Sequence, residues 1–257
     1  MEKINLKKIA AEKAVEEIKP GMVVGLGTGS TFQFALERIA EKIKSGELYN
    51  IVCIPSSDRT EAEARRLGIP LTSFEEQINT NSQLSAFNFP QIIDVTIDGA
   101  DEVTVGHPES DSSDEGSIDV IKGGGGALLK EKILAQATKS FFVVVDESKI
   151  SKHLGEKFFV PIEVIKFAAS IEEKFIQSLG AKTSLRKNAN GENYITDENN
   201  YIIDANFCAI KNVIELARVL EQRAGIVEHG LFVGMAKKVF CSMSNGEVKE
   251  IVLSNQY

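Results

Sequence analysis

The stretch MVVGLGTGST, residues 22–31, decides the predicted fold. Met22 to Leu26 is a short apolar run typical of a buried strand, and the glycine-rich turn after it opens a helix expected over 31–44. Glycines let several backbone N–H groups converge on one point, and the helix N-terminus adds partial positive charge. The stretch therefore predicts a strand, a phosphate-binding turn and a helix. The alternative is a tight turn in which Ser30 or Thr31 only caps the helix.

Strand and helix patterns alternate on both sides of this stretch. Apolar residues at helical spacing predict a helix ahead of it, over Leu6 to Ile18. Further along, the pattern predicts strands at 51–54, 92–97 and 141–145, and helices at 59–67 and 127–138. Such alternation is typical of a parallel sheet with helices on both faces, so we expect an α/β main domain.

The alternation of single strands and helices ends at about residue 154. The pattern predicts a strand at 158–164, a helix at 171–179, short strands between 183 and 207, and a helix at 212–223. This order suits a smaller α+β domain over 155–228. The main domain would then comprise 1–154 and 229–257 and would end in a hairpin.

Composition and charge exclude several classes of protein. With 43% hydrophobic and 26% charged residues in 257, the chain is expected to be globular. Its net charge of -8 argues against nucleic acid or an anionic membrane as partner, but a local pocket can still bind a small anion. The longest apolar run, 141–145, is far shorter than the ~20 residues of a membrane helix.

The cysteines and the N-terminus predict a cytoplasmic protein. Cys53, Cys208 and Cys241 are far apart and in no CxxC spacing, which favours a reducing compartment over a disulfide framework or a zinc site. The first twenty residues carry several glutamates and no continuous apolar segment, unlike a targeting peptide.

Three acids follow the predicted strand 92–97, in the sequence Asp98-Gly99-Ala100-Asp101-Glu102. Ligands of open parallel sheets bind beyond the carboxyl ends of the strands. Acids this close together repel each other, so at least one is expected to exchange protons or to bind sugar hydroxyls. The alternative is that they cap the next turn.

Four glycines, Gly123 to Gly126, follow Lys122 and lead into the helix expected at 127–138. A glycine run loses much conformational entropy on folding, so a close approach of the backbone to a ligand is expected, with Lys122 as a nearby cation.

Glu131 is the candidate general base on that helix. A helical wheel places it among Ala127, Leu128, Leu134, Ala135 and Thr138, whereas Lys132 and Gln136 point elsewhere. Helical side chains tilt toward the N-terminus, so its carboxylate should lean toward the glycines. Apolar surroundings raise the pKa of a carboxyl group, which suits proton abstraction. The alternative is a glutamate that merely complements the helix dipole.

The segment between Val105 and Asp119 is nearly all acidic or turn-forming. It is interpreted as a mobile, solvated loop. A cation site is the alternative, although the acids do not follow EF-hand spacing.

Six motifs, in order along nearly the whole chain, resemble those of the A-type ribose-5-phosphate isomerases. They are GLGTGST (25–31), SSDRT (56–60), DGADE (98–102), KGGGGALLKEKI (122–133), DESK (146–149) and VGMAKKVF (233–240). The resemblance implies metal-independent interconversion of ribose 5-phosphate and ribulose 5-phosphate in the pentose phosphate pathway. It also implies an α/β main domain, a smaller α+β domain and a homo-oligomer, either dimer or tetramer.

The resemblance also implies the site residues. Glu131 looks like the proton acceptor, with Asp98, Asp101 and Lys122 as further catalytic residues and the roles of the two aspartates undivided. The substrate-binding residues would be Lys7, Thr28, Gly29, Ser30, Thr31, Asp98, Gly99, Ala100, Asp101, Lys122, Gly123, Gly124, Gly125 and Lys149. No metal ligand and no cofactor are expected. The chain departs from the family pattern in the length of 105–119 and 188–200, and in Gly126, where alanine is common.

Two other functions compete with the isomerase. A sugar-phosphate sensor would keep the phosphate turn but lose the base, so the presence of Glu131 with Lys122 argues against it. A nicotinamide-dependent oxidoreductase would need a third glycine where Ser30 stands.

Overall fold

The structure is a computed structural model and describes residues 5–80, 91–106 and 116–252. The chain falls into two compact units. The first comprises Met1–Gly99, Lys130–Ser148 and Ala236–Val252, and the second comprises Ala100–Leu129, Lys149–Met235 and Leu253–Tyr257. Most of the acidic segment interpreted as a loop, residues 107–115, lies outside the described residues.

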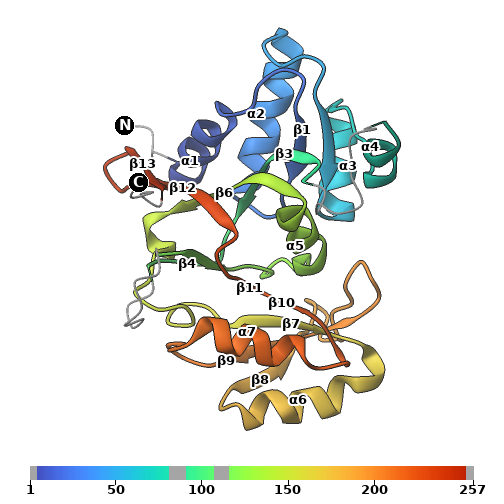
Figure 1. The fold of residues 1–257 in the computed structure, drawn as a ribbon, viewed down its shortest axis with the longest axis vertical. Coiled ribbons are helices and arrows are strands. Elements are labelled where there is room, and N and C mark those ends of the chain that lie inside the picture. The colour runs from blue at the N-terminus through green and yellow to red at the C-terminus, as the bar shows by residue number, and fades with distance from the viewer. Residues whose placement is uncertain (1–4, 81–90, 107–115, 253–257) are drawn as a thin grey trace. The chain divides into compact units, whose positions relative to one another are not determined.

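The first unit is built on a six-stranded sheet with the strand order β13-β12-β6-β3-β1-β2 (Figure 1). All neighbours from β12 to β2 run parallel, and β13 pairs antiparallel with β12 as the expected terminal hairpin. The strands are β1 (Val23–Leu26), β2 (Val52–Pro55), β3 (Ile93–Gly99), β6 (Thr138–Asp146), β12 (Ala236–Ser242) and β13 (Val248–Val252). The helices are α1 (Leu6–Val15), α2 (Phe32–Ser45), α3 (Asp58–Arg66), α4 (Phe74–Thr80) and α5 (Leu128–Gln136), which starts in the second unit.

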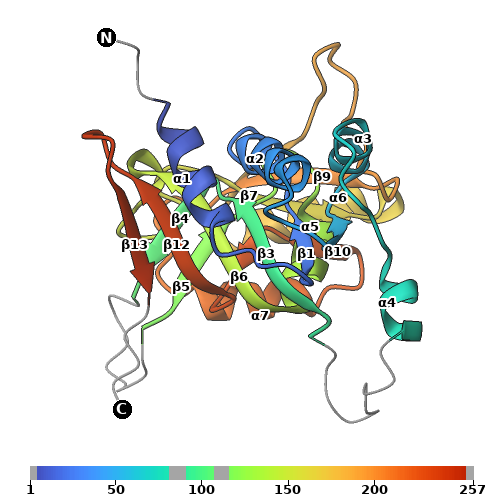
Figure 2. The same ribbon diagram turned by 90° about the horizontal axis from the view of Figure 1, so that it is seen from above.

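Helices cover both faces of this sheet because neighbouring strand residues point to opposite sides. Val24 of β1 belongs to a buried core with Leu36 of α2 and with residues of α1 and α3. Val23, one position earlier, packs with Phe74 of α4 and Leu134 of α5 instead. On the first face, α1 and α2 lie side by side (Figure 2). The predicted α/β class is confirmed.

The ends of the helices follow local chemistry. Ser57 begins α3, because its side chain accepts a hydrogen bond from the N–H of Thr60. α2 ends at Gly46, which has a left-handed φ of 81°. At its start, however, Thr31 makes no side-chain capping hydrogen bond.

The second unit contains two smaller sheets. One has four strands in the order β10-β7-β9-β8, the other has three in the order β11-β5-β4, and all pairs are antiparallel. The strands are β4 (Glu102–Val105), β5 (Ile118–Ile121), β7 (Val160–Val164), β8 (Lys182–Leu185), β9 (Tyr201–Asn206), β10 (Ile226–His229) and β11 (Leu231–Phe232). The helices are α6 (Ala169–Ser178) and α7 (Val213–Glu221), and short 3-10 turns are η1 (Glu147–Lys149), at the boundary, and η2 (Lys166–Ala168).

One apolar core holds the second unit together. Ile162 and Ile203 of the four-stranded sheet pack with Ile176 of α6 and Leu220 of α7. Ile121 of β5 and Leu231 of β11 belong to the same core, so the short strands are part of this unit. The units therefore group 100–129, 149–154 and 229–235 with the smaller sheet, unlike the predicted domains 1–154 with 229–257 and 155–228. That division into domains stays a prediction.

The structure also bears on membrane helices and on the cysteines. No helix among the described residues is long and apolar enough to cross a membrane. Cys53, Cys208 and Cys241 are free, and burial raises the pKa of the Cys53 thiol to about 12.

Candidate functional site

The direction of the strand order reverses at β1, which lies between β2 and β3 in the sheet. From β1 the chain passes through α2 to β2 on one side, and it returns past α3 and α4 to β3 on the other. Ligands of open α/β sheets bind at such a reversal of strand order. The turn Gly25–Thr31 follows β1, and Asp98 lies near the end of β3, so the topology brings two predicted motifs together.

Asp98 ties these two segments to each other. Its Oδ1 accepts hydrogen bonds from the N–H of Thr28 at 2.9 Å and from the N–H of Gly99 at 2.8 Å. Asp98 is only 1% exposed, and a Cβ on Gly27 would lie 2.3 Å from its carboxyl group. Glycine is therefore required at position 27 for the close approach of the two segments.

The hydroxyl of Thr28 is the centre of a cluster of hydroxyl groups. Its Oγ1 lies 2.8 Å from Ser56 Oγ, 2.9 Å from Ser57 Oγ and 3.1 Å from Thr60 Oγ1. Thr60 in turn donates to the carbonyl of Gly27 at 2.9 Å. Both the hydroxyl and the N–H of Thr28 thus bond to the protein itself, and they fix the turn from which Gly29, Ser30 and Thr31 extend.

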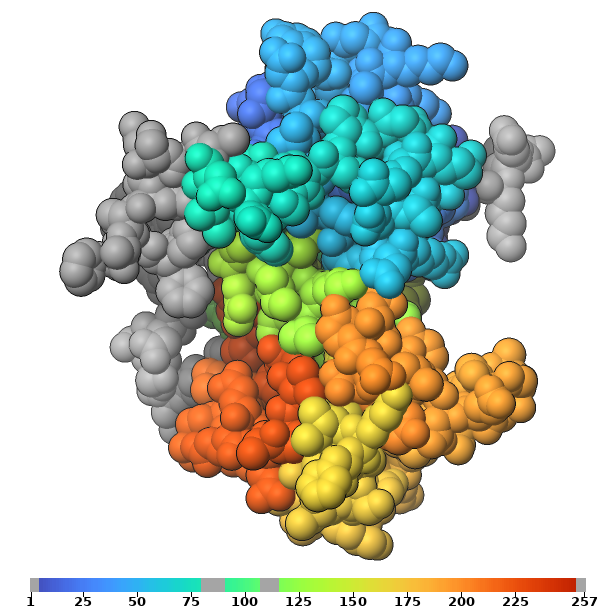
Figure 3. All heavy atoms as spheres, turned by 90° about the vertical axis from the view of Figure 1, so that its right-hand side faces the viewer, coloured from blue at the N-terminus to red at the C-terminus, as the bar shows by residue number. Residues whose placement is uncertain are grey.

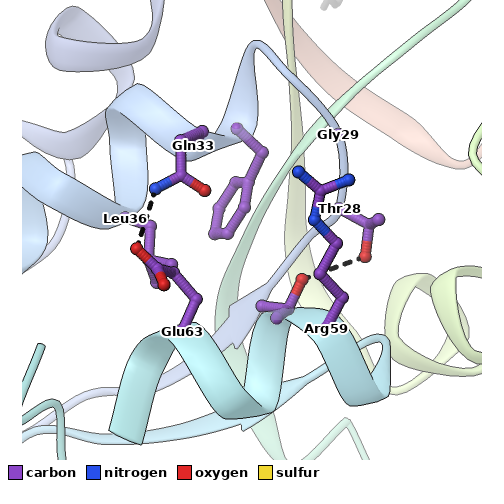
Figure 4. Close-up of a pocket in the computed structure, with 8 residues that line it drawn as sticks. Thr28, Gly29, Gln33, Leu36, Arg59 and Glu63 are labelled. Atoms are coloured by element: carbon purple, nitrogen blue, oxygen red, sulfur yellow. Dashed lines mark hydrogen bonds between the residues drawn. The ribbon is translucent and has the colours of Figure 1, made fainter. Parts of the chain in front are cut away.

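Two cationic side chains reach this turn. Lys7 of α1 donates to Ser30 Oγ at 2.8 Å. Arg59 of α3 lines a cavity of about 20 Å³ with Thr28 and Gly29 (Figure 4), which is room for about one water molecule. Since Thr31 does not cap α2, the simple capping role considered for its side chain is not what the structure contains. A turn with exposed glycine and serine and two cations is suited to binding an anion.

In the second unit, Asp101 holds the Lys122–Gly126 loop. Its Oδ2 accepts the N–H of Gly124 at 2.8 Å, and a Cβ on Gly124 would lie 2.7 Å from its carboxylate. Glu102, the next residue, is fully buried and accepts three backbone N–H groups, those of Gly155, Lys157 and Phe158. The acids of the DGADE motif therefore differ in role, and Glu102 stabilises the fold by fixing the backbone of residues 155–158.

Two lysines of the second unit lie beside aromatic rings. Lys122 is 2% exposed and its Nζ lies 5.6 Å from the centroid of the Phe232 ring. Lys149, in η1, lies 5.9 Å from the Phe158 ring. Such contacts attract the ammonium group to the face of the ring.

Glu131 lies in the first turn of α5 and is 4% exposed. The apolar neighbours that the helical wheel assigned to it, including Leu128, Leu134 and Ala135, are also buried. Of the two residues that the wheel placed off this face, Gln136 is exposed, whereas Lys132 is buried at 5% exposure. The long stem of a lysine can be buried while its ammonium group finds polar partners.

A model of the family described as ribose 5-phosphate isomerase A (phosphoriboisomerase A) matches residues 52–246. The chain belongs to this family.

Relatives and solved structures agree with the family match. Ribose-5-phosphate isomerase A of Desulfatibacillum aliphaticivorans is 49% identical over 241 residues, which cover 94% of each chain. The probable ribose-5-phosphate isomerase 3, chloroplastic, of Arabidopsis thaliana is 43% identical over 94% of this chain and 81% of its own. A D-ribose-5-phosphate isomerase structure in complex with phospho-erythronic acid has a TM-score of 0.83 and 36% identity, covering 97% of this chain and all of its own.

Within this ribose 5-phosphate isomerase A chain, the structure brings together several of the predicted site residues. In the first unit these are Lys7 with Ser30, and Thr28 with Asp98 and Gly99. In the second unit they are Asp101 with Gly124.

Sequence reasoning missed two groups of residues. Arg59 and its neighbours Ser56, Ser57 and Thr60 lie in the SSDRT motif, whose hydroxyl groups and position after β2 were the available signal. Arg186 and Tyr194 contact the Lys122–Gly126 loop, called the glycine loop from here on, and no motif in the sequence around them marks them as site residues.

Proposed function

We propose that this protein interconverts D-ribose 5-phosphate and D-ribulose 5-phosphate in the pentose phosphate pathway. The observation that carries the proposal is the family match over 52–246, because this span contains the two aspartates, Lys122 and Glu131. The ligand named for the similar solved structure, phospho-erythronic acid, is a phosphorylated sugar acid and agrees with a sugar-phosphate substrate.

The Gly25–Thr31 turn binds the phosphate in this proposal. The exposed residues Gly29 and Ser30 and the half-buried Thr31 carry N–H and hydroxyl groups at the start of α2, where the helix dipole favours an anion. Lys7 already contacts Ser30, and Arg59 lines the same turn, so both cations can approach a phosphate there.

In this proposal a base and a set of fixed hydrogen-bond donors act on the sugar carbons. Glu131 takes the proton from C2 and returns it to C1, which leaves an enediolate in between. Lys122 and the N–H of Gly125, which belongs to the exposed residue of the loop, stabilise the negative charge on its oxygens. Asp98 or Asp101 moves the proton between the ring oxygen and the C1 hydroxyl when the furanose opens.

The deciding experiment is incubation of the purified protein with ribose 5-phosphate while ketose formation is measured. Catalytic turnover supports the isomerase. Saturable binding without turnover would instead identify a sugar-phosphate sensor. A substrate-dependent absorbance change with NADH would identify an oxidoreductase.

We further propose that the reaction needs no metal ion and no cofactor. Lys122 and backbone N–H groups can supply the charge stabilisation that a metal would otherwise give. Dialysis against a strong chelator is expected to leave turnover unchanged. Activity that is lost and then restored by Mg²⁺, Mn²⁺ or Zn²⁺ would contradict this.

The remaining proposals concern assembly and location. We propose a homo-oligomer, dimer or tetramer, which light scattering of the purified protein tests directly. The free cysteines support a cytoplasmic location, whereas one relative is named chloroplastic, so imaging of the tagged protein in its own cell is the relevant measurement.

A further inference from the structure

The carbonyl groups of the glycine loop are held from a distant hairpin, residues 186–200, which we call the brace hairpin. It appears in orange at the molecular surface in Figure 3. The N–H of Tyr194 donates to the carbonyl of Arg186 at 2.9 Å, so these two residues face each other across the hairpin. Its tip closes with the N–H of Asn188 donating to the carbonyl of Glu192.

Arg186 and Tyr194 bond to three successive carbonyls of the loop. Arg186 Nη1 donates to the carbonyls of Gly123 at 2.9 Å and Gly124 at 3.1 Å. The Tyr194 hydroxyl donates to the carbonyl of Gly125 at 3.3 Å. Burial raises the pKa of Tyr194 above its ordinary value, so the hydroxyl keeps its proton and remains a donor at neutral pH.

The guanidinium of Arg186 is itself fixed on its other edge. Nε and Nη2 both donate to Asp204, with Nε–Oδ2 at 3.0 Å, and both side chains are largely buried. The rings of Phe159 and Tyr194 lie 5.7 and 5.9 Å from the guanidinium carbon. A planar group held by two bonds to a carboxylate can present its remaining edge in only one direction.

The base of the brace hairpin is anchored as well. Glu163 of β7 accepts hydrogen bonds from Thr196 Oγ1 at 2.8 Å and Asn200 Nδ2 at 2.9 Å. The hairpin is therefore tied to the central strands of the four-stranded sheet at one end and to the glycine loop through its side chains.

Fixing a carbonyl also fixes the next N–H, because the peptide group is planar. The carbonyls of Gly123, Gly124 and Gly125 set the directions of the N–H groups of Gly124, Gly125 and Gly126. The N–H of Gly124 donates to Asp101 and that of Gly126 donates to the carbonyl of Gly123 at 3.0 Å, whereas the N–H of Gly125 belongs to an exposed residue and can face a ligand. Preorganised donors stabilise a developing oxyanion far better than donors that must reorient during the reaction.

We propose that Arg186 and Tyr194 are positioning residues for the isomerase reaction: they hold the two peptide groups on either side of the Gly125 Cα and so set the direction of the Gly125 N–H, which faces the enediolate. This inference rests on the proposed function of that loop. It predicts that loss of Arg186 affects the rate of the chemical step more than substrate affinity.

The test compares Arg186→Met with Arg223→Met. Arg223 is a matched control in the same unit, because it makes two hydrogen bonds to the buried Glu172, at 2.9 and 3.1 Å, and lies 4.4 Å from the Phe175 ring. Both variants are expected to lower the melting temperature. Only Arg186→Met should lower kcat, by about 10- to 100-fold, since small displacements of catalytic groups have effects of this order. Its KM should change less than about threefold.

Two milder variants keep the test decisive if Arg186→Met does not fold. Arg186→Lys retains the charge but cannot serve both Asp204 and the glycine carbonyls, so its kcat should fall about tenfold. Tyr194→Phe retains the ring and removes only the hydroxyl, with an expected fall of about threefold because the bond is long.

The outcomes separate this inference from the proposed function. If wild-type protein does not turn over ribose 5-phosphate, the proposed function itself fails. If it does, and Arg186→Lys keeps full kcat, or Arg223→Met loses as much kcat as Arg186→Met, the positioning role is overturned and Arg186 is a structural ion-pair partner only.

Discussion

The two glycine-rich segments of this protein are fixed by different means. The Gly25–Thr31 turn is held by neutral hydroxyls that follow the next strand of its own sheet, and by Asp98 on the other neighbouring strand. The Lys122–Gly126 loop is held by charged and aromatic groups, Asp101, Arg186 and Tyr194, the last two from a hairpin more than sixty residues away.

This difference matches the tasks proposed for the two segments. A phosphate carries its charge throughout the reaction, so its turn mainly has to offer donors and cations. An enediolate exists only briefly, so the donors that face it have to be aligned before it forms. Changes in the turn are therefore expected to alter KM, and changes in the loop or its helix to alter kcat.

The largest effect is expected for Glu131→Gln. Glutamine keeps the shape of this buried side chain but cannot take the C2 proton, and general-base catalysis contributes about 10²- to 10⁴-fold. We expect kcat to fall by that factor while a binding titration with ribose 5-phosphate shows little change. Retention of more than roughly a tenth of wild-type kcat would mean that Glu131 is not the base, and that Asp98 or Asp101 takes that role.

Gly126→Ala and Gly29→Ala compare the two segments at positions of similar backbone conformation. Their φ values are +92° and +104°, so alanine is strained at both by about 1–2 kcal/mol. A Cβ at Gly126 would also lie 2.2 Å from the Tyr194 hydroxyl, whereas nothing lies within 4 Å of one at Gly29. We expect kcat to fall at least about tenfold for Gly126→Ala, and mainly KM to rise for Gly29→Ala.

Steady-state kinetics and urea unfolding of both glycine variants check this comparison. Equal losses of kcat in the two variants would show that the segments do not divide binding from chemistry in the way proposed.

Thr28→Val tests the hydroxyl cluster. Valine has the shape of threonine but leaves Ser56, Ser57 and Thr60 without their shared partner, which costs about 1–3 kcal/mol of unfolding free energy. We expect KM to rise while kcat stays within a few-fold of wild type. Thr31→Val is the matched control, because its hydroxyl makes no capping bond: unfolding in urea should be unchanged while KM rises. Equal stability of Thr28→Val and wild type would contradict the anchoring role.

The same contrast explains how much the sequence could predict. The Gly25–Thr31 turn, Asp98 and the burial of Glu131 follow from local patterns, since strand, turn and helical wheel are all encoded in adjacent residues. The brace hairpin could not be predicted, because Arg186 and Tyr194 find their partners only once the antiparallel strands pair. Strands β4, β5, β10 and β11 are as short as β1 and β2 or shorter, but they pair antiparallel in the second unit and lie outside the strand–helix alternation that made β1 and β2 predictable.

The smallest effect is expected for Glu163→Gln at the base of the brace hairpin. Burial raises the pKa of Glu163 above 4.5, with Glu198 and Asp197 adding to the shift, although Asn200 and Thr196 oppose it. The folded protein thus binds this proton more tightly than the unfolded chain. The resulting stability is present below about pH 4.5 and is lost as pH rises through the raised folded-state pKa.

Glutamine at this position has no proton to lose, and its Oε1 can still accept both hydrogen bonds. The unfolding free energy of Glu163→Gln, relative to wild type, should therefore increase from pH 4.5 towards pH 7 in urea titrations, while kcat stays within about twofold because the hairpin remains anchored. A difference in stability that does not vary with pH would show that Glu163 is not the titrating group. A large loss of kcat at unchanged stability would show that the base of the brace hairpin needs the negative charge itself, and not only an acceptor, to hold Arg186 and Tyr194 against the loop.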